Sequence, residues 1–258
     1  MASTRVKSAS RVIQILELLG SNKYGMQHKR IVEELDIPKG SLTKLLANLL
    51  DTGYLSFDAG NKTYKLGSKV LALANSYLLG LDIVQAAQPI LRNLVEKTGE
   101  SVSLAVPDGN SALVVHRQYG SQPMSFRLGM GARIPMYATA SGKAILAFLP
   151  KEKVEDYLSS VEMKALTHST ITDPSRLLHE LERVRVQGLA YSRQEHFEGL
   201  VAVAAPVFRS DGYVAGSVTV MYLNIRSTSI QIDVLEPALK EAANELSECL
   251  GYRMNRSA

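Results

Sequence analysis

The stretch DIPKGSLTKLLANLLDTG, residues 36–53, has the pattern of a tight turn followed by an amphipathic helix. Asp36 and Pro38 are residues that end a helix. Gly40 and Ser41 can then turn the chain and cap the next helix. Leucines recur behind this turn at helical spacing, at positions 42, 45, 46, 49 and 50. The stretch therefore predicts a helix that begins near Ser41, buries one leucine face and ends at Gly53.

The sequence on both sides of this helix predicts the other elements of a small domain. Two shorter helical patterns precede it, SASRVIQILELL at 8–19 and QHKRIVEEL at 27–35, the first with Ser8 or Ser10 as a cap. Two alternating segments follow it, YLSFD at 54–58 and TYKLG at 63–67, and the turn AGNK between them predicts a β-hairpin. Three helices and a hairpin predict a winged helix-turn-helix.

The charge of the chain is concentrated in the same region. Residues 1–66 hold ten Lys/Arg and six Asp/Glu, a surplus of four, which equals the net charge of +4 for all 258 residues. The remaining 19 basic and 19 acidic residues cancel (29 − 10 and 25 − 6). By charge alone, a solvated basic face and a footprint for a polyanion are both consistent with this surplus.

The winged pattern favours DNA as that polyanion, because the N-terminal end of a recognition helix meets base edges in the major groove. The predicted base or phosphate contacts at this end are Lys39, Ser41, Thr43 and Lys44. Flanking phosphate contacts are expected from the arm and the hairpin tip, at Arg5, Lys7, Arg11 and Lys62. The alternative is a three-helix protein-interaction module with the same core.

The rest of the chain predicts a linker and a second domain. Residues 67–81 are apolar at most helical positions, which indicates a connecting helix that packs against a partner subunit or an ordinary core helix. Residues 82–258 mix strand-like and helical segments without strict βαβ repetition. We therefore expect an α+β fold, with a sheet and helices packed on it.

Composition sets limits on location and chemistry. No apolar run is long enough to cross a bilayer, and the N-terminus lacks the apolar core of a signal peptide. The single cysteine, Cys249, excludes an internal disulfide and a multi-cysteine metal site. These features predict a cytoplasmic protein without a metal or other cofactor.

The segment YATASGKAIL, residues 137–146, resembles the end of a phosphate-binding loop but fails as one. A Walker loop requires a glycine where Tyr137 stands and Ser or Thr where Ala144 stands. No nucleophile elbow, HExxH or zinc-deaminase pattern occurs elsewhere, so no enzymatic activity is expected. What remains is a helix start capped by Thr139, where Ala140 and Ser141 either admit an anionic ligand to the backbone or merely cap and pack the helix.

Taken together, these motifs resemble IclR-type bacterial transcription regulators. The resemblance rests on IPKGSLTKLLANLLDTGYL, the wing ending YKLG, IPMYATASGKAILA and QEHFEGLVAVAAPVF, in that order along nearly the whole chain. It implies a winged helix-turn-helix at 1–66, a dimerisation helix at 67–81 and a GAF-like effector-binding domain at 82–258, built on an antiparallel sheet with helices packed on it. It also implies a dimer, or a dimer of dimers, on a pseudo-palindromic double-stranded operator.

The resemblance further implies an effector pocket around the SGKAIL helix start. The residues that it places there are Phe126, Ile134, Ala140, Ser141, Ser192, Leu200, Ala202, Val218 and Val220. With alanine and valines at the late positions the lining would be dry, which favours an aromatic or branched carboxylate over glyoxylate or pyruvate. A register shift of one residue in the last strand would instead turn Ser217 and Thr219 inward and remove that preference.

The sequence thus predicts a ligand-controlled repressor or activator of a catabolic operon. Lys44 stands where the family often has arginine, which favours a phosphate contact over bidentate guanine readout there. Two other functions remain open at this point. One is an enzyme fused to a DNA-binding domain, and the other is a DNA-binding protein without an effector.

Overall fold

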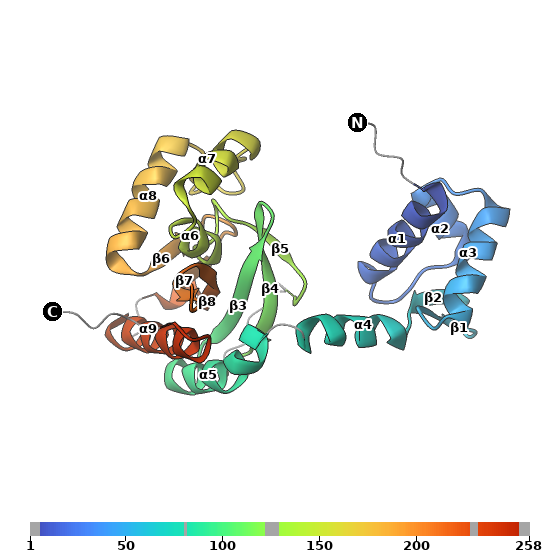
Figure 1. Cartoon of the computed structure of the whole chain (residues 1–258). Coiled ribbons are helices and arrows are strands. Elements are labelled where there is room, and N and C mark those ends of the chain that lie inside the picture. Colours follow the sequence, from blue (N-terminus) through green and yellow to red (C-terminus); the bar gives the residue numbers. More distant parts are fainter. Residues whose placement is uncertain (1–5, 80–81, 122–128, 228–231, 253–258) are drawn as a thin grey trace. The chain divides into compact units, whose positions relative to one another are not determined.

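The structure is a computed structural model that describes residues 6–79, 82–121, 129–227 and 232–252. The chain separates into two compact units, residues 1–80 and 81–258 (Figure 1). Among the described residues no helix is both long and apolar enough to span a membrane.

The N-terminal unit is a winged helix-turn-helix. Its helices are α1 (Lys7–Gly20), α2 (His28–Leu35), α3 (Lys39–Asp51) and α4 (Ser68–Leu79). Strands β1 (Leu55–Asp58) and β2 (Thr63–Leu66) pair as the antiparallel wing. One apolar core, with Ile15, Leu42 and Leu46 almost fully buried, holds the first three helices and the wing together.

Two predicted helix starts are wrong. Helix α1 begins at Lys7 after Val6, without a side-chain cap from Ser8 or Ser10. Helix α3 begins at Lys39, so Ser41 lies inside its first turn instead of capping it. In α3 the fixed φ of Pro38, −53°, already leads the chain into the helix two residues earlier than the serine signal.

The C-terminal unit contains a six-stranded antiparallel sheet in the order β5-β4-β3-β8-β7-β6. Its strands are β3 (Ser101–Asp108), β4 (Ser111–Gln118), β5 (Arg133–Pro135), β6 (Ala190–Arg193), β7 (Leu200–Phe208) and β8 (Val214–Leu223). The antiparallel α+β prediction is therefore confirmed. The short edge strand β5 was not predicted.

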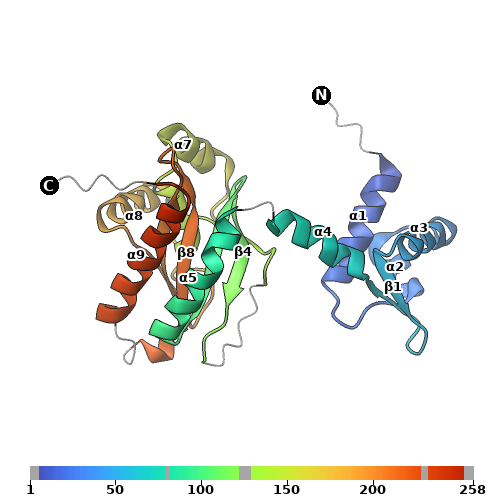
Figure 2. The same cartoon turned by 60° about the horizontal axis from the view of Figure 1, so that its bottom comes forward.

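Helices cover both faces of this sheet. One face carries α5 (Asp82–Thr98) and α9 (Ile232–Cys249), which pack against each other and against the central strands (Figure 2). The other face carries α6 (Ala140–Leu146), with α7 (Lys151–Ser160) and α8 (Pro174–Gln187) beyond it (Figure 1). A single 3-10 turn, η1 (Asn224–Arg226), follows β8. The predicted cap of α8 is confirmed, since Asp173 accepts a hydrogen bond from the Arg176 amide.

Candidate functional site

The N-terminal half of α3 presents cations and a hydroxyl to solvent. Lys39, Thr43 and Lys44 are exposed, while Leu42 and Leu46 on the opposite side are buried in the core. The helical period separates the two sets, so burial of the leucines fixes the outward direction of the polar side chains. This is the arrangement that a recognition helix requires.

Three of the side chains predicted to contact DNA, those of Arg11, Ser41 and Thr43, form hydrogen bonds within the unit. The Arg11 guanidinium on α1 donates to the Ser41 hydroxyl at 3.4 Å. The Thr43 hydroxyl donates to the Lys39 carbonyl at 2.9 Å and lies 3.0 Å from Nε2 of His28, the first residue of α2. A hydroxyl has a single hydrogen, so Thr43 accepts its second bond from His28. His28 thereby orients a recognition-helix side chain, and no sequence signal identified it.

The remaining basic residues lie on the periphery of the unit. Lys62 is exposed at the wing tip in a left-handed conformation, with φ 53°. Lys7 is exposed at the start of α1, and Arg5 lies outside the described residues. Contact of any of these side chains with DNA stays a prediction.

The C-terminal unit holds a cavity between α6 and the sheet. About 480 Å³ of space free of atoms, part of it at the open mouth, lies there. The apolar lining is Val114, Ile134, Ala140, Phe197, Leu200, Ala202 and Met221. The polar lining is Ser103, Arg117, Thr139, Ser141, Ser192, His196 and Thr219. A mixed cavity with one guanidinium suits an organic anion.

Helix α6 approaches the cavity through its first turn. Thr139 caps it as predicted, accepting from the Gly142 amide at 3.1 Å and donating to the Pro135 carbonyl at 2.7 Å. A Cβ at Gly142 would lie 2.1 Å from Cα of Met136. The glycine of the SGKAIL segment therefore serves close packing of α6 on the preceding chain, not a phosphate.

The expectation that Val218 and Val220 face the cavity is wrong. Ser141 Oγ lies 2.7 Å from Thr219 Oγ1, and the Ser217 hydroxyl donates to the Ser141 carbonyl at 3.2 Å. Alternation along β8 then turns Val218 and Val220 to the opposite face, where α5 and α9 cover the sheet. The strand is one residue out of the expected register, so its cavity side carries hydroxyls and the lining is less dry than predicted.

A cation in the cavity was missed by sequence reasoning. Plain alternation along β4 puts Val114 and Arg117 on opposite faces. The pairing of β3 and β4 shifts between Leu104 and Ala105, so Ala105 lies opposite Val114 and Ser103 opposite Arg117. This bulge at Val115 returns Arg117 to the cavity side, with 8% of its surface exposed. Burial lowers the pKa of Arg117, whose ordinary value is far above neutrality, and its charge suits a carboxylate.

The other expected pocket residues are brought together, with one exception. Ile134, Leu200 and Ala202 line the cavity, and so does Ser192, whose hydroxyl donates to the Ala138 carbonyl at 3.0 Å. Phe126 lies outside the described residues. Neighbouring His196, not predicted, also lines the cavity, and burial lowers its pKa to about 4, which keeps the ring neutral near pH 7.

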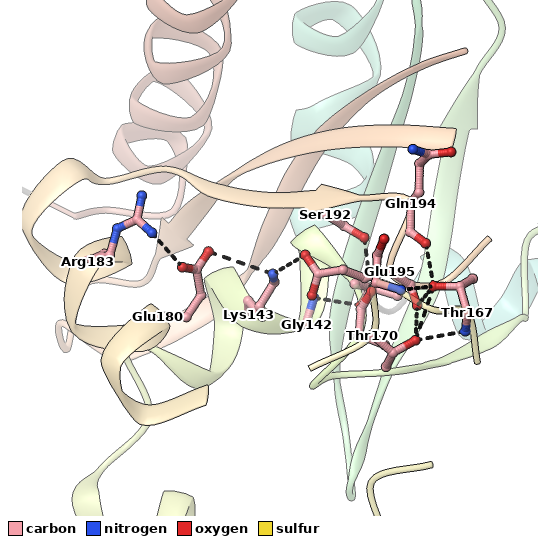
Figure 3. A network of polar contacts seen from close by, with 12 residues as sticks. Gly142, Lys143, Thr167, Thr170, Glu180, Arg183, Ser192, Gln194 and Glu195 are labelled. Atoms are coloured by element: carbon pink, nitrogen blue, oxygen red, sulfur yellow. Dashed lines mark hydrogen bonds and ion pairs between the residues drawn. The ribbon is translucent and has the colours of Figure 1, made fainter. Parts of the chain in front are cut away.

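The lysine of the SGKAIL segment points elsewhere. Lys143 is completely buried, and its ammonium lies 2.7 Å from Glu195 Oε1 and 3.7 Å from Glu180 Oε1 (Figure 3). Neither Lys143 nor Glu195 lines the cavity. Among the described residues no group of three or more His, Cys, Asp or Glu side chains is placed to hold a metal ion.

Comparison with known proteins agrees with this division into two units. Residues 8–59 match the IclR helix-turn-helix domain, and residues 75–248 match the C-terminal domain of bacterial transcriptional regulator IclR. A probable transcriptional regulator of Cupriavidus necator, SauR, is 33% identical over 239 residues, which span 93% of this chain and 95% of that protein.

Solved structures show the same fold. The Thermotoga maritima IclR has a TM-score of 0.84 at 29% identity, covering 96% of this chain and all of that one (100%). An IclR homologue from Microbacterium hydrocarbonoxydans, solved in complex with 4-hydroxybenzoate, has a TM-score of 0.82, covering 95% of this chain and 99% of that one. At 22% identity the latter similarity shows the fold alone.

Proposed function

Because the chain belongs to the IclR family of bacterial transcriptional regulators, we propose that it binds a specific operator and that an organic acid in its C-terminal cavity controls this binding. The chain is a transcriptional regulator with a helix-turn-helix DNA-binding domain, not an enzyme. We place its targets among catabolic genes, as a repressor or an activator, and the protein in the cytoplasm with its DNA.

The buried Arg117 in the cavity is the observation that carries the effector proposal. A guanidinium binds a carboxylate through paired, charge-assisted hydrogen bonds, and burial of Arg117 strengthens such bonds against competition from water. Hydroxyls of Ser103, Ser141 and Thr219 lie on the same side of the sheet, while Phe197 and Met221 supply apolar walls. We propose an aromatic or branched carboxylate that also bears a hydroxyl group. This revises the drier pocket expected from the sequence.

The proposed assembly is a homodimer, with a dimer of dimers on a pseudo-palindromic operator. Helix α4 exposes Leu71 and Leu73, with 72% and 61% of their surfaces accessible, which supports a partner subunit on this helix. Symmetric dimers read two half-sites at a fixed spacing. Sedimentation of the wild type and of Leu71→Glu tests this, since the proposal requires the variant to shift towards monomer.

The central experiment is a fluorescence titration of the upstream DNA of the protein's own gene and of scrambled DNA of equal length. We expect a preference on the order of 10³ for the upstream fragment. The titration is then repeated with 4-hydroxybenzoate, benzoate and pyruvate. We expect 4-hydroxybenzoate to change operator affinity by about 5- to 150-fold, the range for a coupling of about 1–3 kcal/mol.

Each result has a distinct meaning. Equal and steeply salt-dependent binding to both DNAs would contradict sequence-specific recognition. Specific binding that no carboxylate changes would contradict the effector proposal and favour an effector-independent DNA-binding protein. A response to pyruvate alone would contradict the aromatic or branched class.

A further inference from the structure

The buried ion pair between Lys143 and Glu195 joins α6 to the loop between β6 and β7. Lys143 is fully buried, and the Glu195 side chain is 9% exposed. Their 2.7 Å contact links a helix whose first turn lines the cavity with a loop, residues 194–199, that contributes His196 and Phe197 to its wall. We propose that Lys143 is a positioning residue that holds this loop as a wall of the cavity. The inference concerns the same cavity as the proposed effector site.

The loop is fastened from its other side by two threonines. Thr167 Oγ1 donates to the Gln194 carbonyl at 2.7 Å, and Thr170 Oγ1 donates to the Glu195 carbonyl at 2.6 Å (Figure 3). Both threonines lie between α7 and α8. Each threonine holds a backbone carbonyl, and the Glu195 carboxylate has Lys143 as its ion-pair partner.

Bonds within the loop close it into a tight turn. The Gln194 amide donates to the Leu200 carbonyl at 2.9 Å, and the Gln194 side chain accepts from the Gly199 amide at 2.9 Å. Gln194 has φ 62° and Gly199 has φ 76°, both left-handed. A non-glycine residue in that region needs support from its surroundings, which the threonines and Lys143 supply.

The two carboxylates near Lys143, those of Glu195 and Glu180, determine the effect of removing its positive charge. Burial raises the pKa of Glu195, and the Lys143 ammonium counteracts that rise. Glu180, the second carboxylate near Lys143, also pairs with Arg183 at 3.2 Å and keeps that partner. Without Lys143 the Glu195 carboxylate would be buried without a counter-charge, which is strongly unfavourable. Because α6 and α8 are packed in the core, the short loop is the element that can move to hydrate Glu195.

The absence of tryptophan from the chain allows a direct test. Phe197→Trp places the chain's single tryptophan in the cavity wall, and acrylamide quenching of the tryptophan emission then reports its access to solvent. In this background we expect Lys143→Met to raise the quenching constant about threefold, because uncompensated burial of Glu195 drives the loop outward.

Two further variants separate positioning from general damage. Lys143→Met combined with Glu195→Gln removes both charges, so quenching should return most of the way to the Phe197→Trp value. Lys97→Met is the control for loss of an exposed ion pair, because Lys97 pairs with Glu241 at the same distance, 2.7 Å, with side chains 42% and 65% exposed on α5 and α9. We expect it to leave quenching unchanged.

Amide hydrogen exchange repeats the test without the tryptophan. In Lys143→Met the amides of Gln194, Gly199 and Leu200 should exchange about tenfold faster, with β3 and β8 unchanged. Uniformly faster exchange across the sheet, no rescue by the double substitution, or unchanged quenching would overturn the proposal. Because these measurements need neither DNA nor effector, their failure is distinguishable from failure of the proposed function.

Discussion

Val114 and Arg117 both line the cavity, although Arg117 is the third residue after Val114 in β4 and plain alternation would put the two on opposite faces. The bulge at Val115 makes this possible, because it places one extra residue opposite β3 and reverses the facing of everything after it. The bulge therefore places the Arg117 guanidinium in a cavity whose lining is otherwise uncharged near pH 7, and this positive charge suits an anion.

Arg117→Gln should weaken binding of 4-hydroxybenzoate by about 10- to 150-fold, the effect of losing a charge-assisted pair worth about 1.5–3 kcal/mol. Isothermal titration would measure it, and Arg117→Lys should lose less because the charge remains. Operator affinity without effector should stay at the wild-type value. Equal affinity in all three proteins would show that the carboxylate does not bind at Arg117.

Substitutions at the adjacent residues Val218 and Thr219 test which face of β8 lines the cavity. Thr219→Val removes the hydroxyl 2.7 Å from Ser141 and should reduce both effector affinity and stability, the latter by about 1 kcal/mol. Val218→Thr buries a hydroxyl on the α5 and α9 side and should cost about 1–3 kcal/mol with unchanged effector affinity. Urea unfolding measures the stability of the two variants, and ligand titration measures their effector affinity. If Val218→Thr changed effector affinity and Thr219→Val did not, β8 would have the register expected from the sequence.

Gly142→Ala should destabilise the C-terminal unit by several kcal/mol or prevent folding, since the new methyl group would lie 2.1 Å from Met136 Cα. Gly40→Ala in α3 is the control, because apart from its chain neighbours and the backbone of its own helix no atom lies within 4 Å of the added Cβ. Alanine favours helix by about 1 kcal/mol over glycine, so this control should raise stability. Thermal unfolding of the two variants should therefore move in opposite directions.

Lys44→Ala should weaken operator and scrambled DNA alike and reduce the salt slope by about one, because a phosphate contact is sequence-independent. Lys97→Ala, on α5, should leave both quantities unchanged. Titrations at several salt concentrations measure the slope. Loss of sequence preference at one base pair, with the slope unaltered, would instead assign Lys44 to base readout.

His196 should make stability depend on pH below neutrality. Burial lowers its pKa to about 4 from 6.5, so between these values the unfolded chain binds more protons and the free energy of unfolding rises with pH. His196→Gln should remove the part of this pH dependence that lies between about pH 4 and pH 6.5. Above pH 7, His196 is mostly neutral in both the folded and the unfolded chain, so it should contribute little pH dependence there in the wild type either. Urea unfolding of both proteins from pH 4 to pH 7.5 checks the difference, and parallel curves would contradict a buried neutral ring.

Periodicity and turn residues were sufficient for much of the architecture. The leucine spacing of α3, the alternation of β1 and β2 and the Thr139 cap all depend on residues within one helical turn or one hairpin, and these local preferences act in the same direction as the packing. The helix starts at Lys7 and Lys39 were missed because the serines nearby are also suitable caps. Local sequence signals of this kind locate a helix end only to within a few residues.

The sequence by itself determined the winged helix-turn-helix, the antiparallel α+β unit and the presence of a capped helix at Thr139, because each is encoded in short-range spacing. Only the tertiary structure decided which face of β8 meets the cavity, that Arg117 enters it, and that Lys143 pairs with Glu195 instead of a ligand. Strand facing has a period of two, so one bulge or a shift of one residue inverts it, and neither is visible before the strands pair.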